Sequence, residues 1–178
     1  MWKALVSVSV LASALTFGAS AQLSGQSGPI QIEADTLEFL DKQSKAIYMG
    51  NVDAIQGDAR IRTDKLTILF EEKQPAEGQA NSGIGSGVGA VKQLVAEGSV
   101  FYMTPNEQAK GNRGVYNYQN DTIVLTGDVI VTRGENVIVG DRLVIEVGSG
   151  KSTVSANSKK KGERVRTVLV TEEADGEE

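Results

Sequence analysis

The sequence predicts an all-β protein built from repeated strand-kink-strand units. One pattern occurs twice, at a spacing of 77 residues. The chain after Pro29 consists of short runs of alternating apolar and polar residues separated by Gly, Asn and Asp, without a helical stripe. Repetition of a small β unit favours a stacked architecture over an enzyme built around one pocket. The matched residues are Gly50 with Gly127, Val52 with Val129, Asp64 with Asp141 and Leu66 with Leu143.

Residues 1–21 are typical of a cleaved signal peptide. Lys3 supplies a positive charge, residues 4–17 are apolar or small, and Ala19-Ser20-Ala21 forms a small-residue cleavage site. An uncleaved membrane anchor is the less favoured interpretation, because a membrane span needs about 20 apolar residues and this stretch is shorter. We therefore expect an exported chain that begins at Gln22.

The strands that follow change their inward-facing parity at equivalent positions of the repeat. The change falls at Asp35, Asp64 and Asp141. A parity change at the same repeat position predicts a bulge or corner that keeps one face of the strand on the core. Gly98 and Asn112 mark a weaker third copy. The predicted inward-facing residues are Ile32, Leu37, Phe39, Ile61, Leu66, Ile68, Phe70, Val100, Tyr116, Tyr118, Val129, Val131, Leu143 and Ile145.

Two segments depart from this pattern. Residues 74–90 are rich in glycine and predict a mobile surface loop, since no Gly-Lys-Ser/Thr or helix start follows that would indicate phosphate binding. Residues 171–178 form an acidic tail that we expect to be disordered. The β domain is therefore expected over residues 22–170.

Composition excludes several classes of function. The chain has no His and no Cys, which excludes a Ser-His-Asp triad, a Cys nucleophile, a disulfide framework and imidazole or thiolate metal sites. Its formal net charge of −5 disfavours nucleic acid as a partner. No pair of carboxylates is placed for general acid/base catalysis. We expect no enzyme activity, catalytic residue, cofactor or metal.

The apolar face repeated along the sheet is compatible with two architectures. One is a closed sandwich with a filled core, and the other is a folded-over sheet with an apolar groove between its halves. Periodicity does not separate them, because most buried apolar residues only pack.

The order and spacing of several motifs over residues 29–170 resemble the OstA-like family of periplasmic lipopolysaccharide-transport proteins. The Gly-rich segment 74–90 and the acidic tail depart from the family pattern. The motifs are Pro29-Ile-Gln-Ile-Glu-Ala-Asp35, Gly50-Asn-Val52, Gly127-Asp-Val129, Asp64-Lys-Leu66, Asp141-Arg-Leu143 and Lys161-Gly-Glu-Arg-Val-Arg-Thr-Val-Leu-Val170.

The resemblance implies a twisted, open-ended, V-shaped antiparallel β-jellyroll in the periplasm of a Gram-negative cell. Its implied function is to bind the lipid A acyl chains of lipopolysaccharide in an apolar groove and carry the lipid from the inner to the outer membrane. The implied partners are lipopolysaccharide, further copies of the chain stacked head to tail, the inner-membrane transport complex and the outer-membrane translocon, the last two through related OstA-like domains. The alternative is a ligand-free structural protein that polymerises head to tail.

The resemblance also places candidate residues. Ile30, Ile32, Phe70, Phe101, Tyr116 and Tyr118 fall where the family lines its groove. The remaining lipid-binding candidates are the inward-facing Leu37, Phe39, Ile61, Leu66, Ile68, Leu143 and Ile145. An exposed strand edge can dock another chain by strand addition. The predicted edge residues are Ile30 and Ile32 at the start of the domain and Val165, Val168 and Val170 at its end.

Overall fold

The structure is a computed structural model that describes residues 28–72, 89–157 and 162–170. The predicted signal peptide, most of the Gly-rich loop and the acidic tail lie outside the described residues. Within the described residues, no helix is long and apolar enough to cross a membrane.

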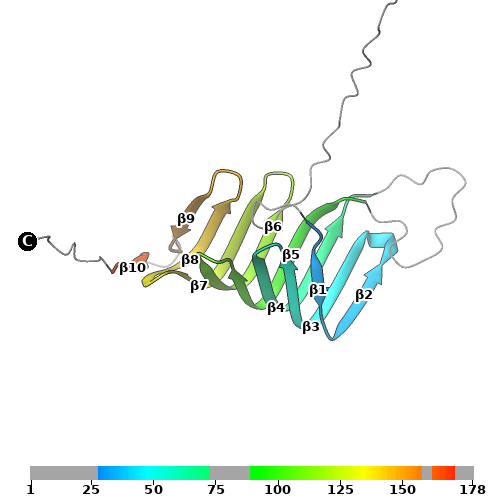
Figure 1. Cartoon of the computed structure of the whole chain (residues 1–178), viewed down its shortest axis with the longest axis horizontal. Coiled ribbons are helices and arrows are strands. Elements are labelled where there is room, and N and C mark those ends of the chain that lie inside the picture. The colour runs from blue at the N-terminus through cyan, green and yellow to red at the C-terminus, as the bar shows by residue number, and fades with distance from the viewer. Residues whose placement is uncertain (1–27, 73–88, 158–161, 171–178) are drawn as a thin grey trace, which may run out of the picture.

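The described chain forms one antiparallel ten-stranded sheet (Figure 1). Its path runs β1-β3-β4-β5-β6-β7-β8-β10, while β2 pairs with β3 and β9 pairs with β8. The only helical turn among the described residues is the 3-10 turn Asp41–Gln43. The all-β prediction is confirmed. The strands are β1 Gln31–Glu33, β2 Thr36–Leu40, β3 Lys45–Gln56, β4 Ala59–Phe70, β5 Val91–Met103, β6 Gln108–Asn117, β7 Thr122–Arg133, β8 Asn136–Glu146, β9 Lys151–Ser155 and β10 Arg166–Val168.

Short strands share a neighbour at each end of the sheet. β1 and β2 both pair with β3, one along each half of its length. β9 and β10 divide β8 in the same way. Each pair of short strands therefore occupies the place of one long, bent strand.

A bend crosses every long strand at the same level. The register shifts between Met49 and Val52, between Arg62 and Lys65, and again in each ladder as far as β7 and β8. This row divides the sheet into two half-sheets. We call them the β1 half, which also contains β10, and the β2 half, which also contains β9. The parity changes expected at Asp35, Asp64 and Asp141 are confirmed, because each lies in this row.

Each bend is held by a polar contact between two adjacent strands. The Asn51 side chain donates to Asp35, and the Ser99 backbone N–H donates to Asp64. Asn112 donates to Asp128 in the same way, and the Asn157 N–H donates to Asp141. We call these four contacts the brackets. Along the sheet they join the β1–β2 pair to β3, β4 to β5, β6 to β7, and β8 to the segment that follows β9.

Glycine lies opposite the bracketing side chain in three of the four brackets, and Ala156 takes this place in the fourth. Gly50, Gly98 and Gly127 all have positive φ values, and a Cβ built on Gly98 would lie 2.1 Å from Asp64 Oδ2. The repeated Asp and Gly of the sequence are therefore two parts of one contact, which the sheet places on adjacent strands.

Replacing Gly98 with alanine should lower the free energy of unfolding by about 2 to 3 kcal/mol, because a Cβ there is both in a left-handed backbone conformation and in collision with Asp64. Gly134→Ala is the matched control. Gly134 also has positive φ but has no atom within 4 Å of the added Cβ, so its variant should lose about 1 kcal/mol. Urea unfolding measures both losses, and equal losses would show that the bracket does not require glycine.

The inner faces of the two half-sheets form a single apolar core. It combines Val52, Ile61 and Val129 of the β1 half with Leu66, Leu125 and Leu143 of the β2 half. No other layer of the described residues covers the outer side of either half-sheet (Figure 1). The core is therefore the space enclosed when the bent sheet folds over on itself.

Candidate functional site

The candidate site is the apolar interior between the half-sheets. The pocket in its middle, between β4 and β7, has a volume of only about 20 Å³, roughly enough for one water molecule. Side chains of the two halves therefore pack against each other. Residues from both halves line this space, namely Ile61, Leu66, Leu94, Ala96, Val100, Tyr102, Gly114, Val115, Tyr116, Ile123 and Leu125.

The two half-sheets are joined through the bend but not along their opposite rims. Among the described residues, the strand ladders run only between neighbours in the sheet, and no backbone hydrogen bond connects the far ends of the β1 half with those of the β2 half. Among the described residues, the two halves meet through the apolar side chains of the core.

Aromatic side chains gather at the rim of the β2 half. The rings of Phe39 and Phe70 have centroids 6.2 Å apart, and those of Tyr116 and Tyr118 are 4.3 Å apart. Phe70 ends β4, and Tyr118 follows β6 directly, so both lie at the strand ends farthest from the bend. Offset and tilted aromatic pairs of this kind add stability beyond their buried area.

The two tyrosines at this rim differ in their polar contacts. The Tyr116 hydroxyl donates to the Asp121 carboxylate. The Tyr118 hydroxyl is buried and has no hydrogen-bond partner among the described residues. Burial, with a smaller contribution from the Asp121 charge, raises the pKa of Tyr118 well above its ordinary value, so the phenol stays protonated.

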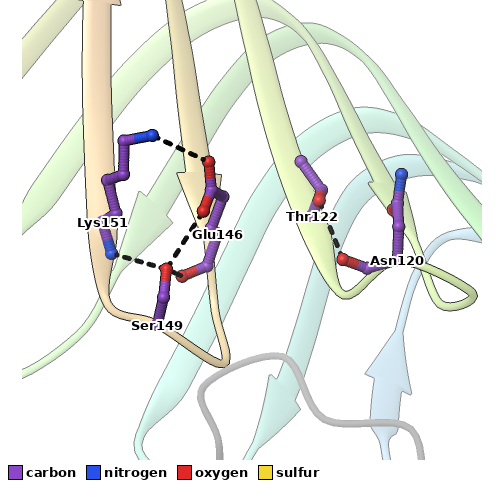
Figure 2. A network of polar contacts seen from close by, with 5 residues as sticks. All are labelled: Asn120, Thr122, Glu146, Ser149 and Lys151. Atoms are coloured by element: carbon purple, nitrogen blue, oxygen red, sulfur yellow. Dashed lines mark hydrogen bonds and ion pairs between the residues drawn. The ribbon is translucent and has the colours of Figure 1, made fainter.

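Polar turns border the same rim. Figure 2 shows the turn between β8 and β9, where Lys151 and Ser149 both contact Glu146. It also shows the β6–β7 turn, where the Thr122 hydroxyl donates to the Asn120 carbonyl. The rim thus changes from apolar to polar over a short distance.

Most of the predicted lipid-binding residues face the interior. Ile61, Leu66, Ile68, Tyr116, Leu143 and Ile145 are buried in the core, and Ile30, Ile32, Phe70 and Tyr118 pack against it. Phe39 contacts Phe70. Leu37 has the same parity as Phe39 but is 50% exposed, because β2 lies at the open end of the sheet.

Phe101 does not face the interior, and its predicted placement is wrong. Its neighbours Val100 and Tyr102 are buried, whereas the Phe101 side chain is 40% exposed and has Lys110 over its ring at 5.6 Å. Adjacent residues of a strand point to opposite faces, so an inward Val100 excludes an inward Phe101. Phe101 instead lines a surface cleft of about 470 Å³ together with Arg62 and Met103.

The prediction missed several interior residues, among them Leu94, Tyr102, Ile123 and Leu125. The run from Gln93 to Glu97, with Leu94 and Ala96 at alternate positions, carried a signal for β5, although the apolar Val95 between them weakens the alternation. For Tyr102 the signal was the parity set by Val100. The burial of Tyr102, together with the charge of Glu107, raises its pKa to about 12.

The outer face of the β1 half carries a charged cluster. Arg60 donates to both carboxylate oxygens of Asp53, and Arg62 contacts the same carboxylate at 3.4 Å. The hydrogen bond from Arg60 holds the pKa of Asp53 below its ordinary value, against a smaller opposing effect of burial. Because these charges are solvated on the outer face, they do not contribute to the interior site.

Both ends of the sheet present strands with one unpaired side. At the C-terminal end Val168 is 63% and Leu169 is 69% exposed, and Val165 and Val170 are also exposed. The Val170 N–H donates to the Asn136 side chain of β8. Since N–H groups alternate along a strand, the Val168 N–H also points to β8 and the Thr167 N–H points to the free side.

The N-terminal end has the same arrangement. The Asp35 N–H donates to the Gly50 carbonyl of β3. By alternation the Ile32 and Ala34 N–H groups point away from β3. Each end of the sheet therefore offers backbone donors that have no partner strand among the described residues.

Comparison with known proteins agrees with this architecture. Residues 31–151 match the family model described as LptA/(LptD N-terminal domain) LPS transport protein. An uncharacterized protein of Rhizobium meliloti (strain 1021) is 31% identical over 152 residues, which is 83% of this chain and 78% of that protein. The lipopolysaccharide export system protein LptA of Escherichia coli (strain K12) is 29% identical over 147 residues, or 80% of this chain and 71% of that protein.

A solved structure shares the fold. The crystal structure of LptH, described as the LptA homologous periplasmic component of the lipopolysaccharide transport device of Pseudomonas aeruginosa, superposes with a TM-score of 0.63 at 19% identity. The match covers 80% of this chain and 96% of LptH. The predicted open antiparallel jellyroll is confirmed by this likeness, and the family match confirms the OstA-like resemblance. The chain belongs to the LptA/LptD N-terminal domain family of lipopolysaccharide transport proteins.

Proposed function

We propose that this protein works in the periplasm as a bridge that binds lipopolysaccharide by its lipid A acyl chains and passes it from the inner to the outer membrane. The observation that carries the proposal is the apolar interior, which runs between two half-sheets from one open end to the other. Family membership supplies the substrate class.

Acyl chains favour such a surface because each CH₂ removed from water contributes about 0.8 kcal/mol. The central pocket as it stands has too little free volume for a chain. Binding therefore requires the two half-sheets to part at the rims. Parting breaks apolar side-chain contacts, which the acyl chain replaces with contacts of the same kind, and it breaks no rim-to-rim backbone hydrogen bond of the described residues.

The two free edges support head-to-tail assembly of the bridge. The brackets divide the sheet into two-strand units, and the sheet contains four whole units. The edge of β9 and β10 thus ends a unit, and the edge of β1 and β2 begins one. A second copy that adds its β1 and β2 to this edge continues the repeat, with its bend row in line with that of the first copy.

This continuity specifies the register of the junction. Neighbouring units pair by one rule. The residue after the bracketing Asp or Asn of one strand lies opposite the residue before the Gly of the other, as Arg142 after Asp141 lies opposite Thr126 before Gly127.

At the junction Ala156 takes the place of the Gly. The same rule then pairs Ser155 with Thr36 of the next copy and Val154 with Leu37. In the other half-sheet, Arg166 pairs with Glu33 and Thr167 with Ile32.

The paired residues are complementary. Leu37, which is half exposed in one protomer, gains Val154 as a cross-strand neighbour. Arg166 lies opposite the oppositely charged Glu33. The N–H groups of Thr167 and Ile32 both point across the junction. The same edges are suited to related OstA-like domains of the inner-membrane complex and the outer-membrane translocon.

One observation favours a second candidate function. The closely packed interior is what a ligand-free structural polymer would have. That candidate shares the head-to-tail junction and differs only in having no lipid inside.

Photo-crosslinking separates the two candidates. A photoreactive phenylalanine analogue at Phe70 should capture lipopolysaccharide in cells, because this ring lies at the interior rim. The same analogue at Phe101 is a matched control on the outer face and should give only background. Capture at neither position would favour the ligand-free polymer, and equal capture at both would remove the case for an interior route.

A further inference from the structure

Tyr118 is the one described residue with a buried side-chain polar atom that lacks a hydrogen-bond partner. Leaving a buried hydroxyl without a hydrogen bond destabilises the folded protein. The neighbouring Tyr116 shows that the fold can satisfy a phenol at this rim, since its hydroxyl donates to Asp121. The unpaired Tyr118 hydroxyl therefore calls for an explanation other than lack of nearby acceptors.

The position of Tyr118 gives that explanation. Its ring packs against the core and against Tyr116, on the interior side of the sheet. Its backbone N–H donates to the Lys92 carbonyl, which fixes the residue at the end of β6. Tyr118 directly follows β6 and begins the polar β6–β7 turn, in which Thr122 donates to Asn120, so it lies where the apolar interior meets the polar rim of the β2 half.

A lipid whose chains enter between the half-sheets carries its carbonyl groups at the same boundary. An ester or amide carbonyl joins the apolar chain to the polar headgroup, and it is a hydrogen-bond acceptor that must be satisfied when it is removed from water. A phenol with an apolar ring and a polar tip suits such a boundary.

We infer that the Tyr118 hydroxyl donates a hydrogen bond to the ester or amide carbonyl of a bound acyl chain and so selects acylated lipids over plain alkyl amphiphiles. This inference rests on the proposed function and adds the chemical group that the interior recognises. Tyr118 serves as a specificity residue, and the protein holds it unpaired in the free state.

Two amphiphiles with disaccharide headgroups and dodecyl-length chains test the inference in the full-length protein. Sucrose monolaurate has an ester carbonyl, and dodecyl maltoside has none. Tyr118→Phe should weaken binding of sucrose monolaurate about fivefold to tenfold, the worth of one hydrogen bond. Binding of dodecyl maltoside should not change. Isothermal titration below the micelle concentrations measures both affinities.

Stability provides a second readout. Tyr118→Phe should leave the melting temperature unchanged or raise it, because the hydroxyl removed has no partner among the described residues. Tyr116→Phe is the matched control: it removes a satisfied hydroxyl, so it should lower the melting temperature and should not discriminate between the two amphiphiles.

Each other result overturns the inference. Equal weakening for both amphiphiles would mean that the ring only packs, and unchanged affinity for sucrose monolaurate would mean that the hydroxyl donates to no carbonyl. A lower melting temperature for Tyr118→Phe would mean that the hydroxyl already has a partner. If the unsubstituted protein binds neither amphiphile, interior binding itself is wrong, and the proposed function fails together with the inference.

Discussion

Replacing Thr167 with proline should convert the assembled protein into monomers while each protomer stays folded. The Thr167 N–H points to the free side of β10, so proline removes no hydrogen bond within the protomer and places its ring where the next copy must pair. Thr167 is exposed and lies on the last strand of the sheet. Light scattering over a dilution series measures the size, and circular dichroism measures the retained β content.

The opposite edge gives a complementary variant. Ala34→Pro blocks the N-terminal edge in the same way, because the Ala34 N–H also points away from β3. Each variant alone keeps one intact edge. An equimolar mixture should therefore form dimers and nothing larger, through the intact β9–β10 edge of one variant and the intact β1–β2 edge of the other.

Thr167→Val is the control for this experiment, since it keeps the backbone N–H and a β-branched side chain and should assemble as before. Filaments of unchanged length from Thr167→Pro would place the junction elsewhere on the surface. Loss of β content would mean that β10 is needed for folding rather than for assembly.

The repeat made much of the fold predictable. Asp64 and Asp141 have the same role in the bend, and their spacing alone located it. The spacing did not reveal that the Asp or Asn of the repeat contacts a residue on an adjacent strand, which follows a glycine in three of the four brackets. That relation depends on the register of the sheet, and in one bracket it joins Asp64 to Ser99 across the long β4–β5 connection.

The site was less predictable, and Phe101 shows the reason. Resemblance aligns residues by position, but it does not fix the face on which a side chain lies. In β5 the even-numbered residues stay inward across the bulge, from Ala96 to Val100, so Phe101 points outward. The periodicity had already placed Val100 inside, and it was the better guide. Nor could the sequence show how closely the two half-sheets pack, because their separation depends on how their side chains interdigitate.

The direction of edge hydrogen bonds was also hidden from the sequence. Val168 was predicted as an edge residue, and its side chain is exposed. Its N–H, however, points to β8, so the donors available to a second copy are those of its neighbours. A strand pattern gives the face of each side chain, whereas the hydrogen-bonding side becomes known only once a partner strand is placed.

A pair of cysteines across the junction should link most of the protein into covalent chains. In the register derived above, Thr153 of one copy lies opposite Glu38 of the next, and both side chains point to the outer face. The double variant Glu38→Cys/Thr153→Cys therefore carries one half of a disulfide on each edge. Because the natural chain has no cysteine, every disulfide formed on oxidation reports this contact, and non-reducing electrophoresis should show a ladder of multimers.

The register is tested by moving one cysteine two residues along β9, to Lys151 or to Ser155, which keeps it on the outer face. Directly opposed residues of an antiparallel pair have Cα atoms about 4.5 to 5.5 Å apart, within the range of a disulfide, whereas diagonal neighbours are about 7 to 8 Å apart. The shifted pairs should therefore link poorly, while Thr153 links almost completely. Strong linkage at Lys151 or Ser155 instead would mean that the bend rows of adjacent copies are out of line. A shift of two residues keeps each side chain on its face, so only the alignment of the brackets and the side-chain pairs across the junction favour the aligned register, and this comparison measures how strongly they do so.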